Sequence, residues 1–285
     1  MAASNLYGLP RPDRTADVVL EGGSREDIID VTYQAWLGAV RQCKDPSESV
    51  EQLYEAACQL VRPFRKKITG ELTGKELKPI RNDPGYVSII NSVSDAGLYI
   101  SALLNETDIT KVTVDRTLPL ISHIGYRLGH EKMIEVGRGE VTWDIFKEAT
   151  CGVGINHGRI EQFMGKENSG GILVNLGHIC HLGYDANGGT FLNFGGDPNT
   201  IGYGAKDGVF VSRTMPSSGN FLPKYDYGGP AYGVKPEELR NDKDLDKMMD
   251  EVEKSARDSD TPAVAKLGRK IDQYVRAHYK PREVA

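Results

Sequence analysis

The sequence predicts an α+β protein that has a helical N-terminal half, a glycine-rich central β section, two C-terminal helices and extended arms. Three observations support this prediction. Apolar residues recur at helical spacing in the first half, short apolar runs interrupted by glycine follow in the centre, and helical spacing returns near the end. Glycine accounts for 32 of the 285 residues, above its usual share of about 7%.

The expected organisation is one compact domain with five segments. They are an N-terminal arm (1–23), a mainly helical region (24–165), a glycine-rich β region (166–213), a second extended arm (214–235) and the C-terminal helices (236–285). No internal repeat is apparent. The glycine excess belongs to the centre of the chain rather than to a low-complexity tail.

The N-terminal half begins with an arm and two helices. Residues 1–23 show no periodicity and contain several Gly and Pro, which is typical of extended chain. Ser24 and Asp27 resemble an N-cap with an acidic first turn, so a helix is expected from Ser24 to about Cys43. A second helix follows, and Pro63 is expected to end it.

Four further helices are expected before the glycine-rich region. Residues 86–104 are mostly apolar, and 117–128, 142–151 and 156–164 show helical spacing next to capping residues or terminal glycines. Together these stretches make the first half predominantly helical.

The central region is expected to be β-structure. From Gly170 to Arg213 the chain consists of short apolar runs separated by glycine. Asn187-Gly188 predicts a β-hairpin, because Asn and Gly both accept the positive φ angles of a type I′ turn.

The C-terminal part is expected to contain a second arm and two helices. Residues 214–235 combine Pro, Tyr and Gly, which favours extended chain. One helix begins at Pro236, and another has Thr261 as N-cap and Pro262 at its first position. The second helix carries an apolar stripe of Val264, Leu267, Ile271, Tyr274 and His278, and we expect its Val264–Leu267–Ile271–Tyr274 face to pack against protein.

The composition limits the classes of function. There are 35 Lys and Arg against 40 Asp and Glu, a net charge of −5 with a pI near 5.8. This balance excludes a globally basic nucleic-acid binder but leaves room for a local basic patch.

The sequence favours a cytoplasmic protein, or a virion component if it is a coat protein. The N-terminus lacks the apolar core of a secretory signal, and residues 86–104 are too polar for a membrane span, so no membrane partner is expected. Four cysteines are too few for a disulfide framework and are expected to be free thiols: Cys43, Cys58, Cys151 and Cys180.

The clearest charge anomaly is a basic strip over residues 62–81. Two acidic residues, Glu71 and Glu76, oppose seven basic ones, which gives a local charge of +5. Such a strip can neutralise phosphates, so it is the candidate nucleic-acid interface. A solvated surface or an ion-pairing strip between subunits explains the same residues. The seven basic residues are Arg62, Arg65, Lys66, Lys67, Lys75, Lys78 and Arg81.

Histidine and cysteine concentrate in the centre without a recognisable site. His178, Cys180 and His181 lie on one expected strand, and thiolate and imidazole are good zinc ligands. No CxxC or HExxH spacing accompanies them, so no metal is assigned. Cys151 and His157 suggest a thiol nucleophile and its base, but sequence proximity does not make a catalytic pair.

No catalytic residue or cofactor is therefore assigned. Gly152-Val153-Gly154 lacks the third glycine of a dinucleotide fingerprint, and no Walker A sequence occurs.

The sequence favours a self-assembling structural subunit, such as a viral coat or nucleocapsid protein or another shell or filament protein. Its partners would be copies of itself, and nucleic acid would contact the basic strip. The arms carry too few apolar groups to offset their ordering entropy, so neighbouring copies would bury them. The alternative is a cytosolic enzyme with a pocket lined by His and Cys in the glycine-rich region. Symmetry, copy number and substrate stay open at this level.

Overall fold

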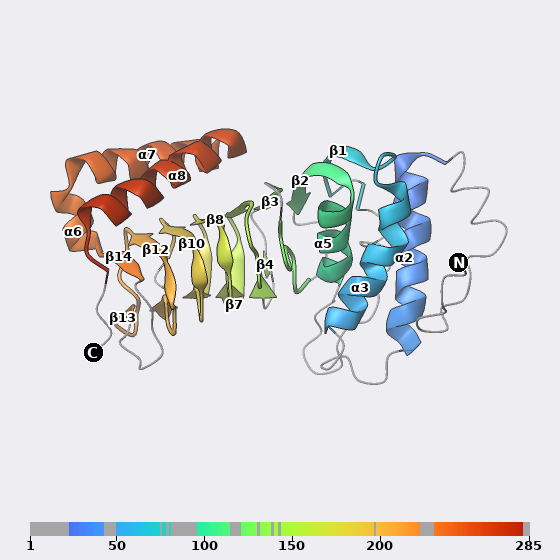
Figure 1. Ribbon diagram of the computed structural model, residues 1–285, viewed down its shortest axis with the longest axis horizontal. Coiled ribbons are helices and arrows are strands. Elements are labelled where there is room, and N and C mark those ends of the chain that lie inside the picture. Colours follow the sequence, from blue (N-terminus) through green and yellow to red (C-terminus); the bar gives the residue numbers. More distant parts are fainter. Residues whose placement is uncertain are drawn as a thin grey trace.

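The structure of the protein is a computed structural model that describes residues 23–42, 50–74, 76, 77, 80, 96–114, 121–129, 132–137, 140, 141, 144–196, 198–222 and 231–281. It shows an elongated β-solenoid of parallel strands, with helices at its N-terminal end and along one face (Figure 1). The combination of helices and strands is as predicted. The expected helical N-terminal half is wrong, because strands already begin at Thr69 and dominate from Asp108 onwards.

Three helices close the N-terminal end of the solenoid: α2 (Arg25–Gln42), α3 (Val50–Val61) and α5 (Ala96–Glu106). The expected start of α2 is confirmed. The Ser24 N–H donates to Asp27 Oδ2 at 3.0 Å, and the Asp27 N–H donates to Ser24 Oγ at 3.2 Å. Asp27 thus takes the part that Glu plays in the usual capping box. After α3, the chain makes one 3₁₀ turn, η1 (Arg62–Phe64), which contains Pro63.

All strand pairs among the described residues are parallel, and these strands form two sheets. Sheet I contains, in spatial order, β1 (Thr69–Leu72), β2 (Asp108–Val114), β3 (Met133–Val136), β6 (Val153–Asn156), β8 (Ser169–Asn175), β10 (Asn187–Asn193), β12 (Asp207–Ser212) and β14 (Tyr232–Val234). Sheet II contains β13 (Asn220–Phe221), β11 (Thr200–Ile201), β9 (His178–Leu182), β7 (Arg159–Met164) and β4 (Glu140–Val141), and β5 (Asp144–Ile145) also pairs with β7. The described part of 214–235 makes a turn, in which the Gly219 N–H donates to the Pro216 carbonyl oxygen at 2.8 Å, and contributes β13 and β14 to the sheets. Residues 1–22 lie outside the described residues.

Several local predictions are wrong for one physical reason. The described residues of 117–128, 142–151 and 156–164 form turns and the strands β5 and β7 rather than helices. Asn187 and Gly188 do not form a hairpin, because both belong to β10, which pairs in parallel with β8 and β12. In a solenoid the chain turns sharply after each short strand. Interior side chains on both sides of a turn therefore recur at a spacing that resembles a helix.

Each full turn of the solenoid, called a rung below, spans 18 or 19 residues, although no repeat is apparent when the sequence is read locally. Asn156, Asn175, Asn193 and Ser212 pair in register on successive strands, 19, 18 and 19 residues apart. At one corner of each rung, glycines 165, 183 and 202 have φ angles of 77°, 64° and 65°. A second series of glycines repeats at the same spacing, since glycines 152, 171, 189 and 208 have φ angles of 93°, 86°, 100° and 124°.

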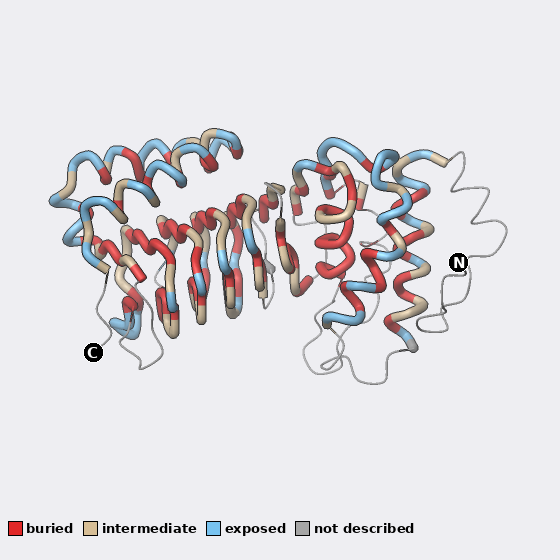
Figure 2. Tube along the Cα trace, in the orientation of Figure 1, coloured by how far each residue is buried: buried red, intermediate tan, exposed pale blue. Residues whose placement is uncertain are grey.

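The interior of the solenoid combines an apolar core with a ladder of buried amides. Asn156 Nδ2 donates to Asn175 Oδ1 at 2.7 Å, and Asn175 Nδ2 donates to Asn193 Oδ1 at 2.8 Å. Asn193 Nδ2 in turn donates to Ser212 Oγ at 3.0 Å. All four side chains are fully buried, and buried residues occur along the strands throughout the solenoid (Figure 2). Each amide supplies a donor and an acceptor, so the ladder satisfies polar groups that burial would otherwise penalise.

The outer face of sheet I is covered by α6 (Pro236–Asn241), α7 (Lys243–Arg257) and α8 (Thr261–His278). The short α6 makes three C-terminal helices instead of the two expected. The predicted packing of α8 is confirmed, since Val264 and Ile271 are fully buried and Leu267 is half-buried against the sheet. Asp260, rather than Thr261, is the N-cap and accepts from the Ala263 N–H at 3.1 Å.

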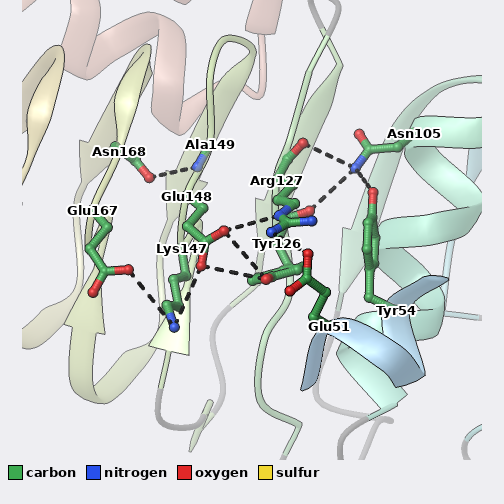
Figure 3. A network of polar contacts seen from close by, with 10 residues as sticks. All are labelled: Glu51, Tyr54, Asn105, Tyr126, Arg127, Lys147, Glu148, Ala149, Glu167 and Asn168. Carbon is green, nitrogen blue, oxygen red and sulfur yellow. Dashed lines mark hydrogen bonds and ion pairs between the residues drawn. The ribbon is translucent and has the colours of Figure 1, made fainter. Parts of the chain in front are cut away.

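One corner of the solenoid is tied to the N-terminal helices by a polar network (Figure 3). Arg127 bridges Glu148 on the next rung, through Nε at 3.0 Å, and Glu51 of α3, through Nη2 at 3.0 Å. Lys147 lies between Glu148 and Glu167, at 3.6 and 3.9 Å. The charges alternate along the corner, so neighbouring rungs attract each other.

Asn105 extends this network into α5. Its Nδ2 donates to Tyr54 OH at 2.8 Å and to the carbonyl oxygens of Tyr126 and Arg127, both at 3.2 Å (Figure 3). The side chain of Asn105 in α5 therefore binds main-chain groups of the solenoid at Tyr126 and Arg127, so the helices and the solenoid form one continuous structure. Of the helices in the described ranges, none has the length and apolar character of a membrane span.

Candidate functional site

Part of the predicted basic strip lines a polar cavity where the N-terminal helices meet the solenoid. The cavity has a volume of about 630 Å³, which is in the range typical of ligand sites. Arg62 and Arg65 reach it from the chain that follows α3, and Lys132 reaches it from the residue before β3. The C-terminal end of α5 supplies the other lining residues: Asn105, Glu106 and Thr107.

Two ion pairs orient the arginines at this cavity, called the basic cavity below. Arg62 contacts Glu106 with two N–H groups, from Nε at 2.6 Å and from Nη2 at 3.1 Å. Arg65 Nε donates to Asp108 Oδ1 at 2.8 Å. These hydrogen bonds hold the pKa values of Glu106 and Asp108 below their usual range. A guanidinium has five N–H donors, so both arginines keep donors outside these pairs.

Lys132 is a third cation at the basic cavity and is not among the predicted residues. Its Nζ donates to the carbonyl oxygens of Thr107 and Ile109, at 3.0 and 2.6 Å. Burial lowers the pKa of Lys132, and the charge of Arg65 lowers it further. No local sequence signal marks Lys132, because only the stacking of β3 beside β2 brings it close to Arg65.

The rest of the basic strip is only partly placed. Lys66 and Lys67 are exposed beside the cavity. Glu76, one of the two acidic residues of the strip, forms an ion pair with Arg25 of α2. Lys75, Lys78 and Arg81 lie outside the described residues.

Cys151 and His157 do not form a catalytic pair. They lie at opposite ends of β6, six positions apart, a separation of roughly 20 Å in an extended strand. His157 instead faces Glu135, with its Nε2 3.3 Å from Oε1. Cys151 lines a groove beside α8 that has no histidine among its described lining residues, so the chemistry expected for the enzyme alternative is not assembled there.

The three residues considered as metal ligands lie on β9, on the surface of sheet II. His181 Nδ1 lies 2.9 Å from Thr200 Oγ1, and its ring stacks on Phe163 at a centroid distance of 5.0 Å. His178 is exposed and Cys180 is half-exposed. Within the described residues, no three His, Cys, Asp or Glu side chains converge as metal ligands would.

Comparison with known protein families, with curated proteins and with solved structures finds no match for this chain.

Proposed function

We propose that the protein is a binding subunit that holds a phosphate-bearing ligand in the basic cavity. The supporting observation is the convergence of Arg62, Arg65 and Lys132 on a cavity whose described lining includes one carboxylate, that of Glu106. Three cations and one anion give this lining a formal charge of +2. A phosphate group would offset that charge.

The chemistry of the arginines suits phosphate recognition. Arg62 is held in one orientation by Glu106 and Arg65 by Asp108, so little side-chain entropy would be lost on binding. Their remaining N–H groups can donate charge-assisted hydrogen bonds to phosphate oxygens. The exposed Lys66 would add long-range attraction. A phosphorylated small molecule and a nucleic-acid backbone share this chemistry.

The test is a binding titration of the full chain with two probes, inorganic pyrophosphate and a single-stranded oligouridylate. We expect Arg65→Glu to weaken binding by about tenfold or more, because a charge-assisted hydrogen bond contributes about 1.5–3 kcal/mol. The matched control is Arg159→Glu, which reverses a similarly exposed arginine on sheet II that is also paired with a carboxylate. Unchanged melting temperatures would show that both variants fold.

The two probes distinguish the source of the phosphate. Tight binding of the oligouridylate, with an affinity that falls steeply with salt, would identify nucleic acid. Binding of pyrophosphate alone would identify a small phosphorylated molecule. The proposal is wrong if neither probe binds at millimolar concentration, or if Arg65→Glu and Arg159→Glu affect binding equally.

A second candidate function is self-assembly, with another copy of the chain as the partner. The observation that favours it is a row of half-exposed aromatic rings on sheet II, whose outer face no described element covers. Phe163 stacks on His181 at 5.0 Å, and Tyr184 stacks on Tyr203 at 5.0 Å. Clustered exposed aromatic residues are typical of protein interfaces. Stacking of solenoid ends into a filament is not favoured, because α5 closes the N-terminal end.

Light scattering tests self-assembly directly. We expect a mass that is a multiple of 31.3 kDa. The double variant Phe163→Glu/Tyr203→Glu should have the mass of a single chain, because association would bury the two added carboxylates without partners. Ala277→Glu, which adds a charge at an exposed position of α8, should leave the mass unchanged. A monomer at high concentration would contradict this candidate.

A further inference from the structure

A second cavity, of about 580 Å³, forms an elongated groove between α8 and the start of the sheet I strands. Its α8 wall consists of residues on one face of that helix, from Pro262 to Arg276. At 1.5 Å per residue this wall is roughly 20 Å long. The groove is separate from the basic cavity and shares none of its lining residues. It is called the α8 groove below.

The floor of the α8 groove is bare backbone. Glycines 152, 171 and 189, on successive rungs, have φ angles of 93°, 86° and 100°. A Cβ at Gly189 would lie 2.9 Å from the Gly170 carbonyl oxygen, so close stacking of the rungs requires glycine there. The three glycines therefore present only backbone atoms to the groove.

The walls change from apolar to polar along the groove. The end near Pro262 is lined by Met133, Val153, Ile172 and Ala265. The other end carries Thr190, Arg269, Asp272, Gln273 and Arg276. The charged residues of the groove lining are Arg269, Asp272 and Arg276, and all three lie at the polar end.

The cationic end is held in place by neighbouring groups. Arg276 contacts Asp272 through Nε and Asp207 through Nη1, both at 3.2 Å, and its guanidinium lies 5.0 Å from the centre of the Tyr232 ring. Thr190 Oγ1 donates to Asp272 Oδ1 at 3.2 Å. These contacts occupy Nε and Nη1 of Arg276 and leave its Nη2 outside the ion pairs.

We propose that the α8 groove binds one elongated amphiphile that has an apolar chain and a monoanionic carboxylate head. The chain lies on the glycine floor beside Ile172, and the head lies between Arg269 and Arg276. The length of the groove, its polarity gradient and the two arginines at its polar end match this ligand class. A compact polar ligand would leave the apolar end empty, and a cationic amphiphile would face both arginines.

Cys151 provides a direct readout, since its side chain lines the α8 groove. In a Cys43→Ser/Cys180→Ser background, the remaining thiols are Cys151 and the buried Cys58. The probe is dodecanoate, kept below its micelle-forming concentration, and the measurement is the rate at which a thiol reagent modifies Cys151. We expect saturating dodecanoate to slow this rate by about tenfold, because the chain covers the groove.

Two further amphiphiles and a pair of variants complete the test. Butyrate, which has the head without the long chain, and dodecyltrimethylammonium, which has the chain with a reversed charge, should both fail to protect Cys151. Arg269→Glu should weaken dodecanoate binding by about tenfold in calorimetric titration. Lys270→Glu, the same charge reversal at the next and exposed position of α8, lies outside the groove lining and should bind normally.

These measurements distinguish an anionic amphiphile from the other ligand classes. The proposal is overturned if dodecanoate does not protect Cys151, if the cationic amphiphile protects it equally, or if Arg269→Glu and Lys270→Glu bind alike. Phosphate binding at the basic cavity would be unaffected by each of these outcomes.

Discussion

Replacing Asn175 with alanine is expected to lower the free energy of unfolding by about 3 kcal/mol or more. Asn175 is the middle amide of the buried ladder. Its Oδ1 accepts from Asn156, and its Nδ2 donates to Asn193 and to the Gly177 carbonyl at 3.1 Å. Alanine leaves partners on both neighbouring rungs unsatisfied in a region that excludes water, and each such loss costs about 1–3 kcal/mol. The missing amide also leaves a cavity.

Urea denaturation followed by circular dichroism measures this effect. The matched control is Asn187→Ala, at an exposed asparagine on the adjacent strand β10, which should change stability by less than about 0.5 kcal/mol. Similar effects for the two variants would show that the ladder does not stabilise the solenoid. A loss confined to Asn175→Ala would show that interior amides help to hold successive rungs together.

The helices are the part of the fold that the sequence predicts best. Helical spacing correctly locates α2, α3 and α8, and the helix expected over 86–104 overlaps α5, because each of these helices buries one face or more against other elements. The C-terminal helix is the clearest example, with Ile271 buried on the predicted stripe. Such spacing is local, so a single window of sequence is enough to detect it.

The solenoid could not be predicted in the same way, because its signals connect positions 18 or 19 residues apart. Gly188 illustrates the difficulty. Next to Asn187 it is typical of a tight turn, yet the structure requires glycine there for another reason. A Cβ at Gly188 would lie 2.5 Å from the Ser169 carbonyl oxygen on the neighbouring rung. Aligning the chain with itself at this spacing, rather than reading it locally, would have superimposed Asn156, Asn175 and Asn193.

The candidate basic cavity was partly predictable. The charge anomaly after α3 identifies Arg62 and Arg65 from the sequence alone. Lys132 could not be identified, since it lies 67 residues after Arg65 and reaches the cavity only through strand pairing. The carboxylates of Glu106 and Asp108 were missed for the same reason, although they determine how the arginines are oriented.

Glu135 is expected to give the largest effect among the charged residues. It projects from β3 toward the turn between α7 and α8, and its side chain is 11% exposed. Its Oε2 lies 2.8 Å from Lys111 Nζ, and its Oε1 accepts from Ser259 Oγ at 2.6 Å. The neighbouring His157, whose Nε2 lies 3.3 Å from Oε1, does most to lower the pKa of Glu135 to about 2; burial opposes this shift, and Lys111 and Ser259 reinforce it.

The lowered pKa makes this contribution depend on pH. In the unfolded chain the pKa of Glu135 returns to about 4.5. The carboxylate therefore stabilises the fold fully above this value, and the stabilisation is lost as the pH falls from about 4.5 to about 2. A difference of about 2.5 pKa units corresponds to about 3 kcal/mol.

Glu135→Gln is the variant that tests this contribution. At pH 7 it should unfold about 3 kcal/mol more easily than the parent chain, because Lys111 loses its counter-charge in a largely buried site. The difference should shrink as the pH falls toward 2, where the parent carboxyl also becomes protonated. Glu161→Gln, which removes one partner of an exposed ion pair on sheet II, should change stability by less than about 1 kcal/mol. If the difference in free energy of unfolding between the parent chain and Glu135→Gln stays constant between pH 7 and pH 3, the ion-pair explanation is wrong. Only loss of the carboxylate charge predicts that the two free energies converge as the pH falls.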